Sequence, residues 1–74
     1  MKAQSLIFVH AFGQDTLSVL ERIEGGILRA GEAATLTPDY RFVAILCDDA
    51  ARTCRELIAD GWDEGQVRVS IGAR

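Results

Sequence analysis

The sequence has few of the residue types that carry most catalytic and metal chemistry. Among its 74 residues there is no asparagine, one histidine and two cysteines. Cys47 and Cys54 form no C-x-x-C pair and have no histidine at ligand spacing, so neither a zinc site nor a redox pair is predicted. We expect both to be reduced packing residues, because free cysteine behaves as a small hydrophobic side chain.

Long hydrophobic runs and excess positive charge are also missing. No apolar run approaches the roughly 18 residues of a transmembrane helix, and the first such run is too short for a signal-peptide core. We therefore expect a cytoplasmic protein with no membrane partner. The net charge is −3, and the eight Lys and Arg residues are scattered along the chain. Binding to a phosphate backbone needs a basic face, so no nucleic-acid partner is expected.

What is present is typical of one folded domain over residues 1–74. Hydrophobic residues make up 49% of the chain and charged residues 26%, as in globular rather than disordered proteins. A chain of this size buries only roughly 60% of the surface that its unfolded form exposes. Such small domains often gain stability by self-association.

Four segments have the patterns of β-strands. The apolar runs Ser5–Ala11 and Tyr40–Cys47 are typical of central strands covered on at least one face. A weaker strand is expected over residues 32–37, followed by a turn at Pro38, whose fixed φ suits a type I turn. Near the end of the chain, alternating apolar residues indicate an edge strand whose apolar side faces the helices. These residues are Val67, Val69 and Ile71.

The first predicted helix covers residues 15–30, with Asp15 as its N-cap and Gly31 as a left-handed C-cap. Gly25 and Gly26 each cost such a helix about 1 kcal/mol relative to alanine, which close packing on a sheet or a kink would explain. Its apolar stripe consists of Leu17, Leu20, Ile23, Ile27 and Leu28.

The second predicted helix begins at Asp48 and Asp49, whose charges suit the positive end of the helix dipole, and it ends at Gly61. Trp62 follows and is expected to cover the end of the core. The buried stripe of this helix consists of Ala51, Cys54, Leu57 and Ile58.

The order β-α-β-β-α-β predicts an α+β, ferredoxin-like fold: a four-stranded antiparallel sheet with both helices on one face. The two central strands are apolar almost throughout, so the opposite face is expected to be too apolar to lie wholly in water. An exposed apolar sheet face usually marks a partner or oligomer interface.

Residues 15–31 resemble the first-helix signature of ACT domains. That signature has an Asp, two variable or proline positions, a Gly, two aliphatic residues, an Ile and an Ala-Gly end, here Ala30-Gly31. The segment from Tyr40 to Ile71 is similar to the family in plan. Two positions depart from the pattern, because Leu17 stands where proline is common and Ser18 where glycine is usual.

The resemblance implies a regulatory module that binds an amino acid or similar small anion and forms a homodimer or higher oligomer. A strand-to-helix loop can bind anions through free N–H groups and the helix dipole; an ordinary capped turn is the alternative. In ACT domains this loop is the effector site, completed by a neighbouring subunit. The implied ligand-binding residues are Phe12, Gly13, Gln14, Asp15, Thr16, Leu17, Ser18 and Val19.

No catalytic residue or cofactor is predicted. His10 has no obvious nucleophile or substrate-activating partner in the sequence, so we interpret it as a half-buried, hydrogen-bonded histidine. Asp48 and Asp49 are interpreted as helix caps rather than metal ligands. The alternative function is a ligand-free assembly module whose open sheet face or edge strand pairs with itself or with another protein.

Overall fold

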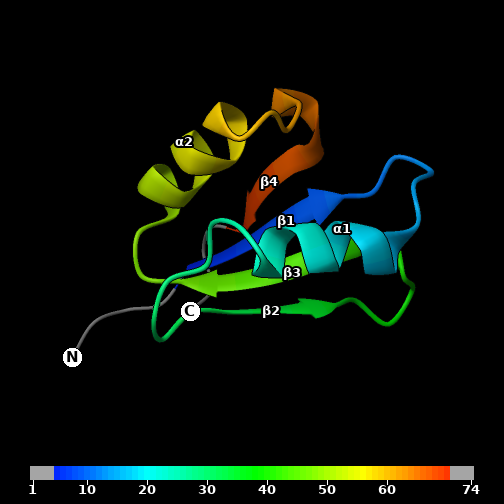
Figure 1. Cartoon of the computed structure of the whole chain (residues 1–74), viewed down its shortest axis with the longest axis horizontal. Coiled ribbons are helices and arrows are strands. Elements are labelled where there is room, and N and C mark those ends of the chain that lie inside the picture. The colour runs from blue at the N-terminus through cyan, green and yellow to red at the C-terminus, as the bar shows by residue number, and fades with distance from the viewer. Residues whose placement is uncertain (1–4, 71–74) are drawn as a thin grey trace.

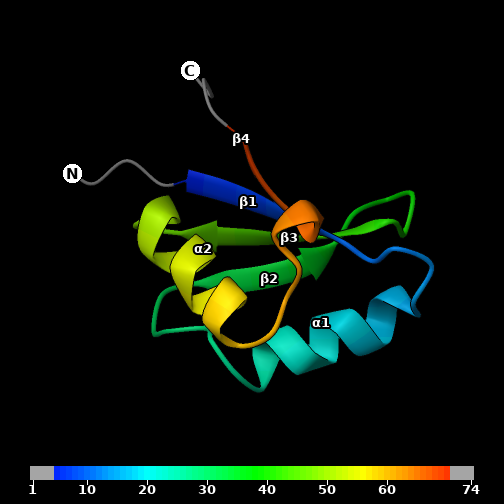
Figure 2. The same ribbon diagram turned by 90° about the horizontal axis from the view of Figure 1, so that it is seen from above.

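The fold is a four-stranded antiparallel sheet with two helices on one of its faces (Figures 1 and 2). The computed structural model describes residues 5–70. The strands lie in the order β2-β3-β1-β4, so β2 and β4 are the edges. This is the α+β, ferredoxin-like arrangement that the sequence predicts. Its elements are β1 (Ser5–His10), α1 (Thr16–Glu24), β2 (Ala33–Leu36), β3 (Phe42–Cys47), α2 (Ala50–Ala59), the short 3₁₀ helix η1 (Glu64–Gln66) and β4 (Val67–Ser70).

Alternate residues of the two central strands form the floor of the core. Ile7 of β1 lies opposite Ile45 of β3, and all of Ile7, Val9, Val43 and Ile45 are fully buried. On the other side of β1, Val69 lies opposite Ile7 and Val67 opposite Val9. Directly opposed residues of antiparallel strands point to the same face, so Val67 and Val69 face the helices as predicted. Ile71 lies outside the described residues.

The helices complete the core from the other side. α1 packs against β2 and β3, and α2 against β1 and β4. Val19 and Ile23 of α1, Leu57 of α2 and Trp62 join the buried strand residues. Complete burial of such an aliphatic side chain contributes about 1.5–3 kcal/mol. Trp62 is only 4% exposed, which confirms its predicted place at the end of the core.

The first helix is shorter than the sequence predicts. It ends at Glu24, and Gly25 is its C-cap. The prediction of a helix to residue 30 was wrong because two consecutive glycines remove side-chain contacts and cost a helix about 1 kcal/mol each. Gly31 does have the expected left-handed backbone, with φ +86, but in the turn before β2 rather than at a helix end. Ile27 and Leu28 still pack against the core, although the backbone there is not helical.

The buried stripes of both helices also differ from the predicted ones. Leu17 is 50% exposed and Ile58 42% exposed, and Ala51 is exposed as well. Thr16 and Thr53 are buried in their place. A buried hydroxyl is stable when it is hydrogen-bonded, and the Thr16 hydroxyl donates to the carbonyl of Tyr40. Hydropathy alone does not identify such threonines as inward-facing.

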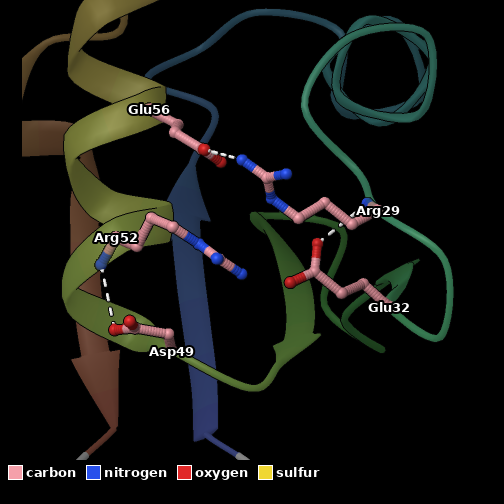
Figure 3. Close-up of polar contacts among 5 residues, drawn as sticks. All are labelled: Arg29, Glu32, Asp49, Arg52 and Glu56. Atoms are coloured by element: carbon pink, nitrogen blue, oxygen red, sulfur yellow. Dashed lines mark hydrogen bonds and ion pairs between the residues drawn. The ribbon is translucent and has the colours of Figure 1, made fainter.

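A polar link joins the α1–β2 loop to α2 (Figure 3). The Arg29 guanidinium forms an ion pair with Glu56 on α2, and the Arg29 backbone N–H donates to the Glu32 carboxylate over 2.9 Å. Asp49 caps α2 as predicted, accepting the Arg52 N–H at 3.1 Å. Partly exposed ion pairs contribute about 0.2–1 kcal/mol, so this link sets the course of the loop more than it stabilises the fold.

A second link joins α1 to the C-terminal end of α2. The Arg22 guanidinium lies 4.1 Å from the centre of the Trp62 ring and donates to the Asp60 carbonyl at 2.7 Å. A cation over an indole face contributes about 0.5–1 kcal/mol at a partly exposed site. Arg22 therefore holds the C-terminal end of α2 against α1.

Two truncations on α1 test the position of its buried face. Ile23→Ala removes a side chain that is 1% exposed and should lower the free energy of unfolding by about 2–5 kcal/mol. Leu17→Ala, the matched control, should change it by no more than about 0.5 kcal/mol. Urea denaturation followed by Trp62 fluorescence measures both. Equal losses would contradict this rotation of the helix.

Candidate ligand-binding site

A hollow of about 380 Å³ lies where the β1–α1 loop passes the end of the β2–β3 turn. Its two walls come from segments far apart in the sequence, residues 10–16 and residues 40–41. It lies at the start of α1, where the helix dipole is positive. The lining residues are His10, Ala11, Phe12, Gly13, Gln14, Thr16, Tyr40 and Arg41.

Four of the eight residues implied by the ACT resemblance line this hollow, namely Phe12, Gly13, Gln14 and Thr16. Asp15, Leu17 and Ser18 are exposed beside it without lining it. Val19 is 3% exposed and belongs to the core, so its side chain is not available to a ligand.

Tyr40 and Arg41 are not among the ligand-binding residues that the ACT resemblance implies. Both begin the second apolar run and were included in its predicted strand, whereas β3 starts at Phe42. Tyr40 is 66% exposed with φ +59. The Tyr-Arg pair at the polar start of an otherwise apolar run was the available signal. Because β1 and β3 pair antiparallel, with His10 opposite Phe42, Tyr40 and Arg41 lie beside His10. This proximity depends on strand pairing and not on any local sequence pattern.

Hydrogen bonds fix the two walls of the hollow to each other. The Ala11 N–H donates to the Arg41 carbonyl at 2.9 Å, and the Thr16 hydroxyl donates to the Tyr40 carbonyl. Phe12 on one wall and Tyr40 on the other have positive φ values of 52 and 59. Left-handed backbone costs a non-glycine residue about 1–2 kcal/mol. The surrounding contacts therefore hold this hollow in a conformation that the local sequence does not favour.

His10 is held from both its ring and its backbone. The Phe12 N–H donates to Nδ1 at 2.8 Å, and Gln66 Nε2 donates to the His10 carbonyl at 2.9 Å. Because Nδ1 accepts this bond, a hydrogen bond that the ring itself donates comes from Nε2. The ring also packs 4.7 Å from the ring centre of Phe42. The prediction of a half-buried, hydrogen-bonded histidine is confirmed.

Asp15 occupies the N-cap position but makes no capping hydrogen bond. Its carboxylate instead accepts the Ser18 hydroxyl at 3.0 Å. The prediction that this carboxylate caps the first-turn N–H groups was therefore wrong: Ser18, one turn along, offers a competing donor. Because an α-helix leaves its first N–H groups without intrahelical acceptors, those of α1 are available to water or to a ligand.

Neither thiol nor metal chemistry is indicated at other places in residues 5–70. No cluster of three or more His, Cys, Asp or Glu side chains there could hold a metal ion. Cys47 is 1% exposed, and burial raises the pKa of both Cys47 and Cys54, which keeps them as neutral thiols. Within the same residues, no helix has the length and apolar character to cross a membrane.

No protein-family model matches this chain, and comparison with curated proteins and with solved structures gives no significant match. The resemblance to ACT domains therefore stays a proposal.

Asp39 shapes the turn that carries Tyr40 and Arg41. The Thr37 hydroxyl donates to its carboxylate at 2.6 Å and the Arg41 N–H at 3.1 Å. These hydrogen bonds lower the pKa of Asp39 below its ordinary value. The bond from the Thr37 hydroxyl contributes most, followed by the bond from the Arg41 amide. The folded state therefore binds the Asp39 proton less tightly than the unfolded state does. The charged Asp39 carboxylate accordingly stabilises the fold above the ordinary pKa of Asp, and this contribution is lost as pH falls through the lowered pKa.

Thr37→Val should raise the pKa of Asp39 toward its ordinary value, because it removes the hydroxyl that contributes most to the shift. Thr37→Ser, which keeps a hydroxyl, should leave the pKa low. A carboxyl ¹³C NMR titration of the three proteins measures the difference. An unchanged pKa in Thr37→Val would show that the hydroxyl does not stabilise the charged carboxylate.

Proposed function

We propose that this chain is a regulatory module of the ACT type that binds an amino acid or a similar small anion at the β1–α1 loop and acts through oligomerisation. One observation carries the proposal. Thr16 at the start of α1, a helix that Asp15 does not cap, lines one hollow of about 380 Å³ together with Arg41 and His10. These groups are donors, and donors at a helix N-terminus favour an anion.

The surroundings of the hollow suit both charges of an amino acid. Its carboxylate would accept from Arg41 and from the α1 amides, because charge-assisted hydrogen bonds are the stronger ones. Its ammonium group would pair with Asp15, which lies between two lining residues and keeps an exposed carboxylate. The ring of Phe12, 51% exposed, offers an apolar contact for a side chain.

A second candidate is a ligand-free assembly module. It is favoured by the outer edge of β4, which has no strand partner within residues 5–70 and where Val69 is 40% exposed on the helix-facing side of the sheet. Exposed apolar edge strands are templates for pairing with another chain. The two candidates differ in what each requires, since only the first needs a small molecule.

Thermal unfolding in the presence of each of the twenty amino acids tests the first candidate. A ligand at ten times its Kd stabilises the folded state by about 1.4 kcal/mol, which is a shift of roughly 6–11 °C for a domain of this size. We expect at least one amino acid at 10 mM to raise the melting temperature. Arg41→Gln should reduce that shift by more than half, because it removes the cation on the ligand carboxylate.

Arg68→Gln is the matched control. Arg68 is also exposed, but it lies opposite Phe8 on the open face of the sheet and does not line the hollow. This variant should keep the full shift. If no amino acid changes the melting temperature at 10 mM, the binding proposal is wrong. The assembly module is then the better-supported hypothesis of the two.

A further inference from the structure

The open face of the sheet carries a hollow that the proposed function does not use. Both helices lie on the opposite face (Figure 2). This open-face hollow has a volume of about 420 Å³ and shares no lining residue with the hollow beside the β1–α1 loop. Its lining residues are Phe8, Thr37, Pro38, Asp39, Phe42 and Arg68.

The open-face hollow runs across the sheet from β4 to the β2–β3 turn. Phe8 of β1 and Arg68 of β4 are directly opposite each other, so both side chains lie on the same face. Phe42 belongs to β3, on the other side of β1. The Thr37 N–H donates to the Phe42 carbonyl at 3.0 Å, which places the turn beside Phe42. Arg68 and the turn therefore stand at opposite ends of a floor that the two phenylalanine rings form.

The two rings of the floor are arranged to accept a third. Phe8 and Phe42 are half-buried, and their ring centres lie 6.1 Å apart with an interplanar angle of 79°. Two rings set nearly at right angles form a corner, in which a flat ring lies parallel to one and meets the other with its edge. Stacked and edge-to-face contacts are the preferred geometries of aromatic pairs. The floor therefore favours a planar aromatic group.

The charged groups at the two ends differ in what they still need. Oδ1 of Asp39 already accepts the Thr37 hydroxyl and the Arg41 N–H. Arg68 is exposed, and within residues 5–70 its guanidinium makes no hydrogen bond or ion pair. A guanidinium presents its N–H donors in a fork that matches the two oxygens of a carboxylate. The group that best complements this hollow is therefore a carboxylate at the Arg68 end.

The hollow between α2 and β4 shows no comparable preference. Its volume is about 430 Å³, and both an arginine and a glutamate line it, Arg55 and Glu64. No aromatic ring is among its lining residues. Neither the sign of its charge nor the shape of a ring selects a ligand there.

We propose that the open-face hollow binds a small planar aromatic carboxylate, whose ring rests on Phe8 and Phe42 and whose carboxylate pairs with Arg68. A volume of about 420 Å³ lies within the usual range of small-molecule sites. Amino acids fit this hollow less well, because the ammonium group next to their carboxylate would be repelled by the Arg68 charge. The site is thus separate from the proposed amino-acid site and does not depend on it.

Titration of the full chain with 2-naphthoate, followed by ¹H–¹⁵N NMR, tests the ligand class. We expect saturable shifts of the Phe8, Phe42 and Arg68 amide signals, with a dissociation constant in the millimolar range or lower, as for other ligands of this size. An absence of saturable shifts at these residues up to 10 mM 2-naphthoate overturns the proposal.

Two matched compounds separate the contributions of charge and ring. 2-Naphthylmethylammonium has the same ring and a positive charge, and it should bind at least about 10-fold more weakly, because it cannot pair with Arg68. Decahydro-2-naphthoate keeps the carboxylate and the carbon skeleton without the aromatic ring, and it should bind about 5-fold more weakly. Equal or tighter binding of either compound contradicts the recognition that we propose.

Arg68→Gln tests the site on the protein. It should raise the dissociation constant of 2-naphthoate at least about 10-fold, because the charge-assisted pair is lost. Arg55→Gln is the matched control, at an exposed arginine of α2 that does not line this hollow, and it should bind as the wild type does. Phe8→Leu, which stays apolar, should weaken binding about 5-fold. Unchanged binding in Arg68→Gln, or an equal loss in Arg55→Gln, would refute the site.

Other outcomes point to other occupants. If a second copy of the chain covered this face, the Phe8, Phe42 and Arg68 amide signals would shift on dilution of the protein and would not respond to 2-naphthoate, which rejects the proposal. Amino-acid binding is judged separately, by the thermal shift. A chain that binds 2-naphthoate but shows no shift with any amino acid would keep this site and reject the proposed function, and the reverse pattern would reject this site alone.

Discussion

The structure depends on the burial of alternate residues of β1 and β3 beneath two short helices. Ile7, Val9, Val43 and Ile45 are fully enclosed, and their register fixes which side of every other strand faces the helices. The helices have only 9 and 10 residues. They cover the centre of the sheet but leave the outer side of β4 open, so the uncovered edge follows from the small size of the core.

The same register creates the hollow beside the β1–α1 loop. Pairing His10 with Phe42 brings the end of β1 to the β2–β3 turn, and the Thr16 hydroxyl fastens the start of α1 to that turn. The left-handed residues Phe12 and Tyr40 persist there because bonds from neighbouring elements hold the backbone. Strain of this kind persists where the surroundings determine the conformation, and it is frequent at binding sites.

The strands and their order could be predicted because alternation and apolar runs are properties of single segments. Other features depend on what meets what in three dimensions. The hydroxyl of Thr16 is buried only because the Tyr40 carbonyl reaches it. Asp15 fails as a cap because Ser18 competes for its carboxylate. Half of the predicted loop lines the hollow, but Arg41 enters through strand pairing, which no local pattern reports.

A short path of hydrogen bonds joins the hollow to the start of β4. Gln66 donates from Nε2 to the carbonyl of His10, a residue of the hollow, and its Oε1 accepts the Asp63 N–H at 3.1 Å. Gln66 is 7% exposed and immediately precedes Val67, the first residue of β4. A ligand that orders His10 would thereby favour one position of the start of β4.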